Sequence, residues 1–178
     1  GPDSVRSYAT ELAASEAVHP DAHDAFFSII DQAAHSVANA FQSVQPRSIR
    51  LHGDFHRGNV LDRQDEGLVA IDFDDLSVGP AVQDLWLLMP SRYAECPDAW
   101  NAALEGYERF MPFDRSELAL VESLRILRMI HYLAWQTRQR NDAGFATHFP
   151  LWGSRSFWMQ ETEDLRTQLD TIGEGTSP

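Results

Sequence analysis

A polar loop between short apolar runs constrains this 178-residue chain more than any other feature of its sequence. The loop begins at His52, ends at Asn59 and reads His-Gly-Asp-Phe-His-Arg-Gly-Asn. One apolar run leads into it, a second leads out of it, and a third ends at Asp72. These runs predict short strands over residues 48–51, 59–61 and 68–71. The acceptor-rich side chains of Asp54, Asn59 and Asp72 are therefore expected to converge.

The segment between the second and third runs predicts a hairpin. Residues 62–67, which read Asp-Arg-Gln-Asp-Glu-Gly, have the polar composition of a turn. A hairpin there would place the loop and Asp72 at adjoining strand ends, over one cleft. Carboxylate and amide oxygens are hard ligands of the kind that Mg²⁺ takes, usually together with phosphate oxygens of a substrate.

Helical periodicity predicts most of the remaining structure. Phe26, Ile30 and Val37 recur at helical spacing, which indicates core packing, and Pro46 ends that helix before the first strand. A hydrophobic content of 43% argues for a globular chain, and we expect residues 1–178 to form a single domain. The expected helices are residues 4–15, 20–44, 81–89, 97–110, 114–140 and 154–172.

The loop motif is part of a larger set that resembles a known superfamily. The loop, followed thirteen residues after Asn59 by Asp-Phe-Asp-Asp, resembles the catalytic core of the aminoglycoside phosphotransferase and choline kinase superfamily. With Gly-Pro-Ala-Val-Gln-Asp-Leu-Trp and His-Tyr-Leu-Ala-Trp further on, the chain is most similar to the stress-response kinases, which are bacterial serine/threonine protein kinases. The resemblance runs from about residue 50 to residue 158.

This resemblance implies a fold. The superfamily is a branch of the protein-kinase-like fold, so the chain is expected to be α+β and mainly helical. It would form the C-terminal lobe of that fold, with a small β-hairpin sheet at the cleft. The catalytic loop would span residues 52–59, and the metal-binding loop would span residues 72–75.

The resemblance also assigns roles to residues of these two loops. Asp54 would orient an attacking hydroxyl and accept its proton. Asp72, the second catalytic residue, would be the principal magnesium ligand, and Asn59 would bind magnesium and the nucleotide. His56 would contact phosphate or metal-bound water, or would simply pack against its neighbours.

Other polar residues have supporting or open roles. The imidazole of His52 is expected to hydrogen bond to backbone and hold the loop, and Asp84 would accept backbone amide bonds from the catalytic loop. Asp74 would assist a second metal ion or help to bind substrate. For Arg57 we expect a salt bridge with nearby acidic residues rather than neutralisation of a phosphate.

All fourteen basic side chains are arginines, so the chain contains no lysine. Kinases of this fold hold the phosphates of ATP with a lysine on an N-terminal strand, under a glycine-rich loop. The ten glycines never form Gly-x-Gly-x-x-Gly. We therefore expect the N-terminal nucleotide-clamping lobe to be absent from this chain, and the isolated chain to be inactive as a kinase.

A net charge of −13 narrows the range of partners. Nucleic acids and anionic membranes are disfavoured, because both bind proteins largely through basic side chains. No apolar run approaches the ~20 residues that a membrane-spanning helix needs, and the single cysteine, Cys96, cannot form an internal disulfide. We expect a cytoplasmic protein that binds ATP and a hydroxyl acceptor, and a monomer when full length.

The activity that the resemblance implies is ATP- and Mg²⁺-dependent phosphoryl transfer to a hydroxyl, with serine or threonine of proteins as the acceptor. Small-molecule kinases that act on aminoglycosides, choline or homoserine share the core motifs, so these acceptors stay open. A noncatalytic lobe that acts as a binding module is an alternative from another class, supported by the missing lysine. A metallophosphoesterase is disfavoured because its Gly-Asn-His and Gly-His-x-His strings do not occur.

Overall fold

The computed structural model describes residues 1–175 of the chain. Its backbone divides into two compact units. Unit 1 consists of Gly1–Ser43 and the segment that starts at Glu122, and unit 2 consists of Val44–Val121. Both loops that carry the predicted site residues belong to unit 2. The expectation of a single domain over residues 1–178 stays a prediction.

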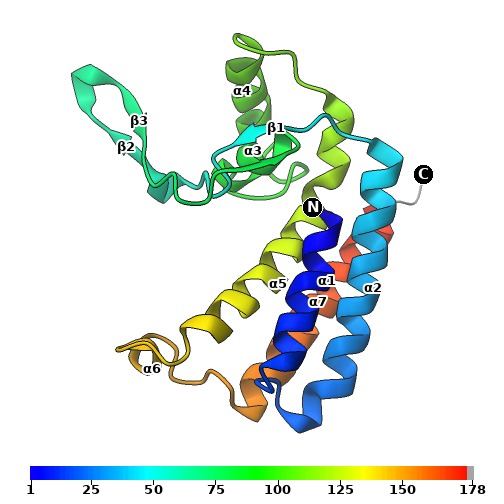
Figure 1. Ribbon diagram of the computed structural model, residues 1–178. Coiled ribbons are helices and arrows are strands. Elements are labelled where there is room, and N and C mark those ends of the chain that lie inside the picture. Colours follow the sequence, from blue (N-terminus) through cyan, green and yellow to red (C-terminus); the bar gives the residue numbers. More distant parts are fainter. Residues whose placement is uncertain (176–178) are drawn as a thin grey trace. The chain divides into compact units, whose positions relative to one another are not determined.

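Helices build unit 1, and the long ones α1, α2 and α7 run alongside one another in Figure 1. Their apolar stripes meet in a core where Phe26 of α2 packs edge-on against Trp158 of α7, with 5.2 Å between ring centroids. Both rings are fully buried. The elements are α1 (Pro2–Ala14), α2 (Pro20–Val44), α5 (Val121–Gln139), α6 (Phe145–His148) and α7 (Arg155–Gly175).

The helices expected in unit 1 are confirmed, with ends that differ by a few residues. Pro20 opens α2 at a position where the missing amide hydrogen costs nothing, and Asp21 follows in the first turn, where negative charge is favourable. Ser154 caps α7 by accepting a hydrogen bond from the amide of Phe157 at 3.2 Å. The short helix α6 was not predicted.

Unit 2 contains antiparallel strand pairs. Strand β2 (Val60–Asp62) pairs with β3 (Leu68–Ala70), and the 3-10 helix η2 (Gln64–Glu66) lies in the turn between them. The hairpin predicted between residues 61 and 68 is therefore confirmed. Figure 1 shows it extending away from the second pair, in which β1 (Ile49–Leu51) runs beside β4 (Ser77–Gly79).

Two features of unit 2 differ from expectation. Strand β4 was not predicted, because three residues are too few to show an alternating pattern. The long helix expected over residues 114–140 begins instead as a 3-10 helix, η3 (Arg115–Leu120), before α5. Asp114 caps the start of η3, since its carboxylate accepts a hydrogen bond from the amide of Ser116 at 2.9 Å.

Short helices complete unit 2. They are η1 (Arg57–Asn59), α3 (Val82–Leu88) and α4 (Pro97–Glu108). Helix α3 buries Val82, Leu85 and Trp86, and α4 buries Trp100 and Leu104. Burial on both helices fixes α3 within the unit, which matters because α3 carries Asp84.

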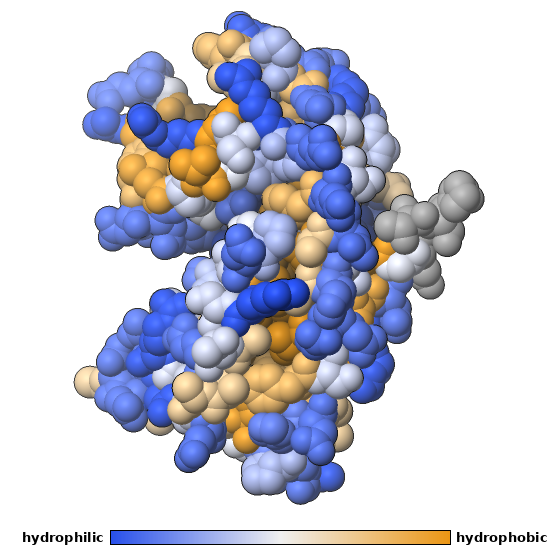
Figure 2. Space-filling view, turned by 45° about the vertical axis from the view of Figure 1, so that its right-hand side comes forward, coloured by the Kyte–Doolittle hydropathy of each residue, from blue (hydrophilic) through white to orange (hydrophobic). Residues whose placement is uncertain are grey.

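Some large apolar side chains of unit 2 remain exposed on the hairpin and on the segment that follows it. They are Leu61, Leu68, Phe73, Leu76 and Val78. Figure 2 shows apolar (orange) surface beside hydrophilic (blue) surface on one face of the molecule. Within residues 1–175, the structure holds no helix that is long and apolar enough to cross a membrane.

Candidate active site

His52, the first residue of the polar loop, joins that loop to the end of the hairpin. Its side chain is buried, and its Nε2 atom lies 2.8 Å from the carbonyl oxygen of Ile71. Because a carbonyl can only accept, Nε2 carries the proton. The amide of Ile71 in turn donates to the carbonyl of Asn59 at 3.0 Å. The residue before Asp72 is thus bonded to both ends of the loop.

Asp84 holds the same loop from the side of α3. One carboxylate oxygen accepts the amide of His52 at 2.7 Å, and the other accepts the amide of Gly53 at 3.0 Å. Such charge-assisted bonds to backbone amides are stronger than neutral ones. These two hydrogen bonds hold the backbone of the loop in place. The role of Asp84 in supporting a reaction stays a prediction.

Gly53 allows the two loops to approach each other closely. Its φ of +90° lies in the region that favours glycine. A Cβ atom at this position would fall 1.9 Å from the carbonyl oxygen of Asp75 and 3.1 Å from Oγ of Ser77. The backbone of residues 52–59 therefore packs directly against the backbone of residues 72–75.

Asn59 is buried at the far end of the loop, and its side chain turns back toward Asp54. Its Nδ2 atom donates to the carbonyl oxygen of Asp54 at 2.9 Å. This bond orients the amide and leaves Oδ1 as its acceptor end. This hydrogen bond thereby closes the segment from Asp54 to Asn59 into a compact turn.

His56 lies beside Asp54 in the middle of the loop. Its Nδ1 atom accepts the amide hydrogen of Gly58 at 3.0 Å, so the proton of the neutral ring is on Nε2. That Nε2 is 3.5 Å from a carboxylate oxygen of Asp54. The imidazole N–H therefore faces the carboxylate that is predicted to act as the base.

Asp72 follows β3 in a conformation that side chains seldom adopt. Its φ is +64°, which is left-handed backbone, and its side chain is exposed. Non-glycine residues in this region cost free energy and are found at functional sites more often than elsewhere. Asp74 and Asp75 are also exposed in the same loop.

The donor atoms present fit magnesium in kind. Oδ1 of Asn59 and the carboxylate of Asp72 are hard oxygen ligands, and Mg²⁺ typically binds through one or two carboxylates plus waters and substrate phosphates. Within the described residues, no group of three or more His, Cys, Asp or Glu side chains is placed to hold a metal ion. Asn59, Asp72 and Asp74 as metal ligands stay a prediction.

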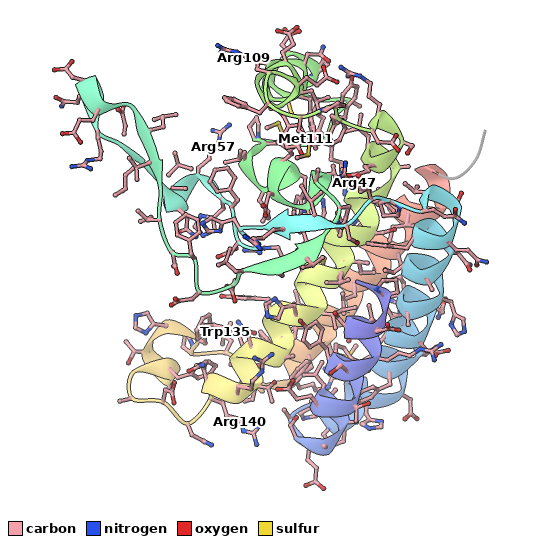
Figure 3. All side chains as sticks on the ribbon, turned by 45° about the horizontal axis from the view of Figure 1, so that its top comes forward. Arg47, Arg57, Arg109, Met111, Trp135 and Arg140 are labelled. Atoms are coloured by element: carbon pink, nitrogen blue, oxygen red, sulfur yellow. The ribbon has the colours of Figure 1, made fainter. Side chains whose placement is uncertain are left out.

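Arg57 makes a contact that the sequence did not predict. Its Nε atom donates to the carbonyl oxygen of Leu88 at 2.8 Å, where α3 ends. Figure 3 shows Arg57 projecting from the catalytic loop. A backbone carbonyl at the C-terminal end of a helix is a favourable partner for a cation. This bond therefore connects the loop to the C-terminal end of α3.

Glu117 of η3 is a second polar residue that sequence reasoning missed. Its side chain is 3% exposed, and it accepts the amide of Val82 at 3.0 Å. Burial raises the pKa of this carboxyl above its ordinary value, while the bond from Val82 acts in the opposite direction. No local sequence pattern indicates the contact between Glu117 and Val82, since these residues are 35 positions apart.

This fold and this loop geometry agree with the comparison to known proteins. The chain matches the phosphotransferase enzyme family over residues 3–121, and it belongs to that family. The resemblance inferred from the loop motifs is thereby confirmed.

Particular relatives are named as kinases. Stress response kinase A of Escherichia coli (strain K12) is 40% identical over 126 residues, and its counterpart in Shigella flexneri is 38% identical. The serine/threonine protein kinase RdoA of Salmonella typhimurium is 38% identical over 127 residues. Each match covers 71% of this chain and 38% of the relative, so the chain spans well under half the length of these curated relatives.

Proposed function

We propose that this chain is the catalytic lobe of a longer serine/threonine protein kinase that transfers a phosphoryl group from ATP to a protein hydroxyl. The observation that carries the proposal is the bonding around Asp54, where Asn59 and His56 both contact one residue. The kinase names of the relatives support a protein acceptor. Family membership supports phosphoryl transfer in general.

Asp54 is the base in this proposal. Its carboxylate accepts the proton of the attacking hydroxyl, and the Nε2–H of His56 at 3.5 Å steadies the carboxylate's orientation. Phosphoryl transfer depends mostly on positioning and charge stabilisation, so a fixed carboxylate at the loop is sufficient for this step. The bonds from His52 and Asp84 provide that fixation.

Asn59 and Asp72 would hold the magnesium ion, and Asp74 would assist a second one. When bound, magnesium neutralises negative charge on the phosphate oxygens. Asn59 is suited to this role because its Nδ2 is already bonded to Asp54 and its Oδ1 is left as the acceptor. Asp72 is suited because its left-handed backbone follows directly from Ile71, which His52 holds.

The nucleotide clamp is proposed to lie on an N-terminal lobe outside this sequence. The chain has no lysine to hold the ATP phosphates, and exposed apolar side chains such as Leu68 and Phe73 lie on the hairpin and the loop after it. A lobe packed there would cover them. We propose that the full-length protein is a monomer in the cytoplasm, where ATP is available and the thiol of Cys96 stays reduced.

Two alternatives have specific support. Small-molecule kinases for aminoglycosides, choline or homoserine would use the same loop residues, since acceptor recognition lies elsewhere in such folds. A noncatalytic lobe that only binds a partner is supported by the absence of lysine.

An acceptor panel separates these possibilities. The intact protein would be given γ-labelled ATP with Mg²⁺ and, in separate reactions, a serine/threonine protein substrate, an aminoglycoside, choline and homoserine. The proposal predicts labelling of the protein alone. Labelling of a small molecule alone would identify a small-molecule kinase, and no labelling by the intact protein would favour the binding module.

A further inference from the structure

Helix α3 has no capping side chain at its N-terminal end, which is the end that carries Asp84. Its N-cap residue is Ala81, whose methyl side chain cannot accept a hydrogen bond. The first amides of a helix have no partner inside it and need one from elsewhere. In this chain Glu117 supplies it, because its carboxyl accepts the amide of Val82, the first residue of α3.

Asp84 lies in that same first turn. It is two residues after Val82, and its carboxylate binds the amides of His52 and Gly53. A continuous path of hydrogen bonds and one helical turn therefore runs from Glu117 to the catalytic loop. Helix α3 has only seven residues, so its first turn is a large part of it and is poorly stabilised by the rest of the helix.

We propose that Glu117 is a positioning residue, which holds the first turn of α3 and, through Asp84, the backbone of the catalytic loop at His52 and Gly53. The effect of Glu117 on the loop concerns the structure of this chain alone. Its consequence for phosphoryl transfer rests on the proposed function. In this proposal Glu117 acts through Val82 and Asp84 and is not itself a residue that meets substrate.

Two substitutions of Glu117 distinguish the effect of its side-chain length from the effect of its charge. Glu117→Gln keeps the length of the side chain and one acceptor oxygen, but removes the charge and one of the two oxygens on which the amides of Val82 and Ala81 act. Glu117→Asp keeps the charge but shortens the side chain by one methylene, so the carboxylate no longer reaches the amide. Asp98→Asn is the matched control, because it removes the charge of an exposed carboxylate in the first turn of another helix of unit 2, α4.

The measurement is hydrogen exchange of individual backbone amides by NMR on this chain. In Glu117→Asp the amides of His52 and Gly53 are expected to exchange about tenfold faster, because a buried amide of α3 has lost its acceptor. Glu117→Gln, which keeps one acceptor oxygen, is expected to accelerate exchange less than Glu117→Asp does, and Asp98→Asn is expected to stay close to the unchanged chain. The amide of Arg63, bonded to Gly67 within the hairpin turn, serves as the internal reference.

Several results would overturn the proposal. They are unchanged exchange at His52 and Gly53 in Glu117→Asp, faster exchange in Glu117→Gln than in Glu117→Asp, and equal acceleration in Asp98→Asn. If Glu117→Asp does not fold, Glu117→Gln still decides the matter: faster exchange at His52 and Gly53 than in Asp98→Asn supports the positioning role, and equal exchange contradicts it.

Turnover by the intact protein is a second and separate readout. A positioning role predicts that Glu117→Asp lowers kcat and leaves KM for ATP nearly unchanged, because the nucleotide is proposed to be clamped elsewhere. Amide exchange needs no turnover. Absence of kinase activity would therefore reject the proposed function while leaving the positioning role to be judged by exchange alone.

Discussion

The imidazole of His52 and the carbonyl oxygen of Ile71 are joined by a 2.8 Å hydrogen bond between residues 19 positions apart. The backbone amide of the same histidine is held by Asp84 at 2.7 Å. One residue thus connects the loop of residues 52–59, the end of the hairpin and helix α3. The positions of Asp54 and Asp72 both depend on this connection.

Asp84→Asn is expected to destabilise unit 2. An asparagine keeps one acceptor oxygen, but its NH₂ group would face a backbone N–H, and one of the two amides would lose its partner. The cost is expected to be about 1–3 kcal/mol in the free energy of unfolding, measured by urea denaturation. Asp62→Asn is the control, because Asp62 is exposed and bonds only locally to the amide of Gln64. Equal stability of the two variants would contradict the supporting role.

Gly53→Ala is expected to be more damaging than Gly67→Ala. Both glycines have positive φ, at +90° and +84°, so both substitutions strain the backbone. Only at Gly53 does a Cβ atom also collide with the carbonyl of Asp75, while the space around Gly67 is open. We expect a loss of about 1–3 kcal/mol for Gly67→Ala, whose ψ of −162° lies in a region essentially confined to glycine. The loss for Gly53→Ala is expected to be larger, because the collision adds to the strain.

Urea denaturation of both glycine variants measures the difference. If Gly67→Ala were as costly as Gly53→Ala, the close approach of the two loops would not be the cause of the loss.

Substitutions of Asp72 should separate backbone strain from chemistry. Because its φ is +64°, Asp72→Gly is expected to be more stable than Asp72→Ala by about 1 kcal/mol. Both variants remove the carboxylate, so both should lose phosphoryl transfer in the intact protein. The opposite order of stability would show that the left-handed conformation is not occupied in solution.

Stability should depend on pH through Glu117. Burial raises the pKa of its carboxyl above the ordinary value of 4.5, so the folded chain binds this proton more tightly than the unfolded chain does. As the pH rises from 4.5 through the folded-state pKa, this group makes the free energy of unfolding fall. Glu117→Gln cannot ionise and lacks this fall, so its stability relative to the unchanged chain should increase over that range.

Denaturation in urea near pH 4.5 and at neutral pH tests this sign. Burial also raises the pKa of Glu161, but that group is present in both proteins and its contribution cancels. A stability difference that stays constant, or that shrinks as the pH rises, would contradict the account.

Local patterns predicted the parts of this structure that local forces determine. The helical spacing of Phe26 and Ile30 predicted α2, and the polar segment after Leu61 predicted the hairpin. The spacing of five residues between Asp54 and Asn59 places both in one short loop, where Asn59 bonds back to Asp54. The expected convergence of Asp72 with them stays a prediction.

Contacts between distant segments were not predictable in this way. The pairing of β4 with β1 involves three residues on each side, too few for a periodic signal. In the sequence, Glu117 looks like an ordinary acidic residue in the first turn of a helix, and nothing nearby indicates its contact with Val82. Arg57 was expected to pair with acidic residues rather than with the carbonyl of Leu88. These contacts arise from packing between segments, which one sequence does not display.

The most direct test of the account is the rate of phosphate transfer by the intact protein with Asp54→Asn. Asparagine keeps the shape of the side chain but cannot accept the proton of the hydroxyl. The account predicts that kcat falls at least about a hundredfold, while Asp62→Asn leaves it unchanged. A transfer rate in Asp54→Asn equal to that of the unchanged protein would contradict the assignment of Asp54 as the base, and with it the proposed active site.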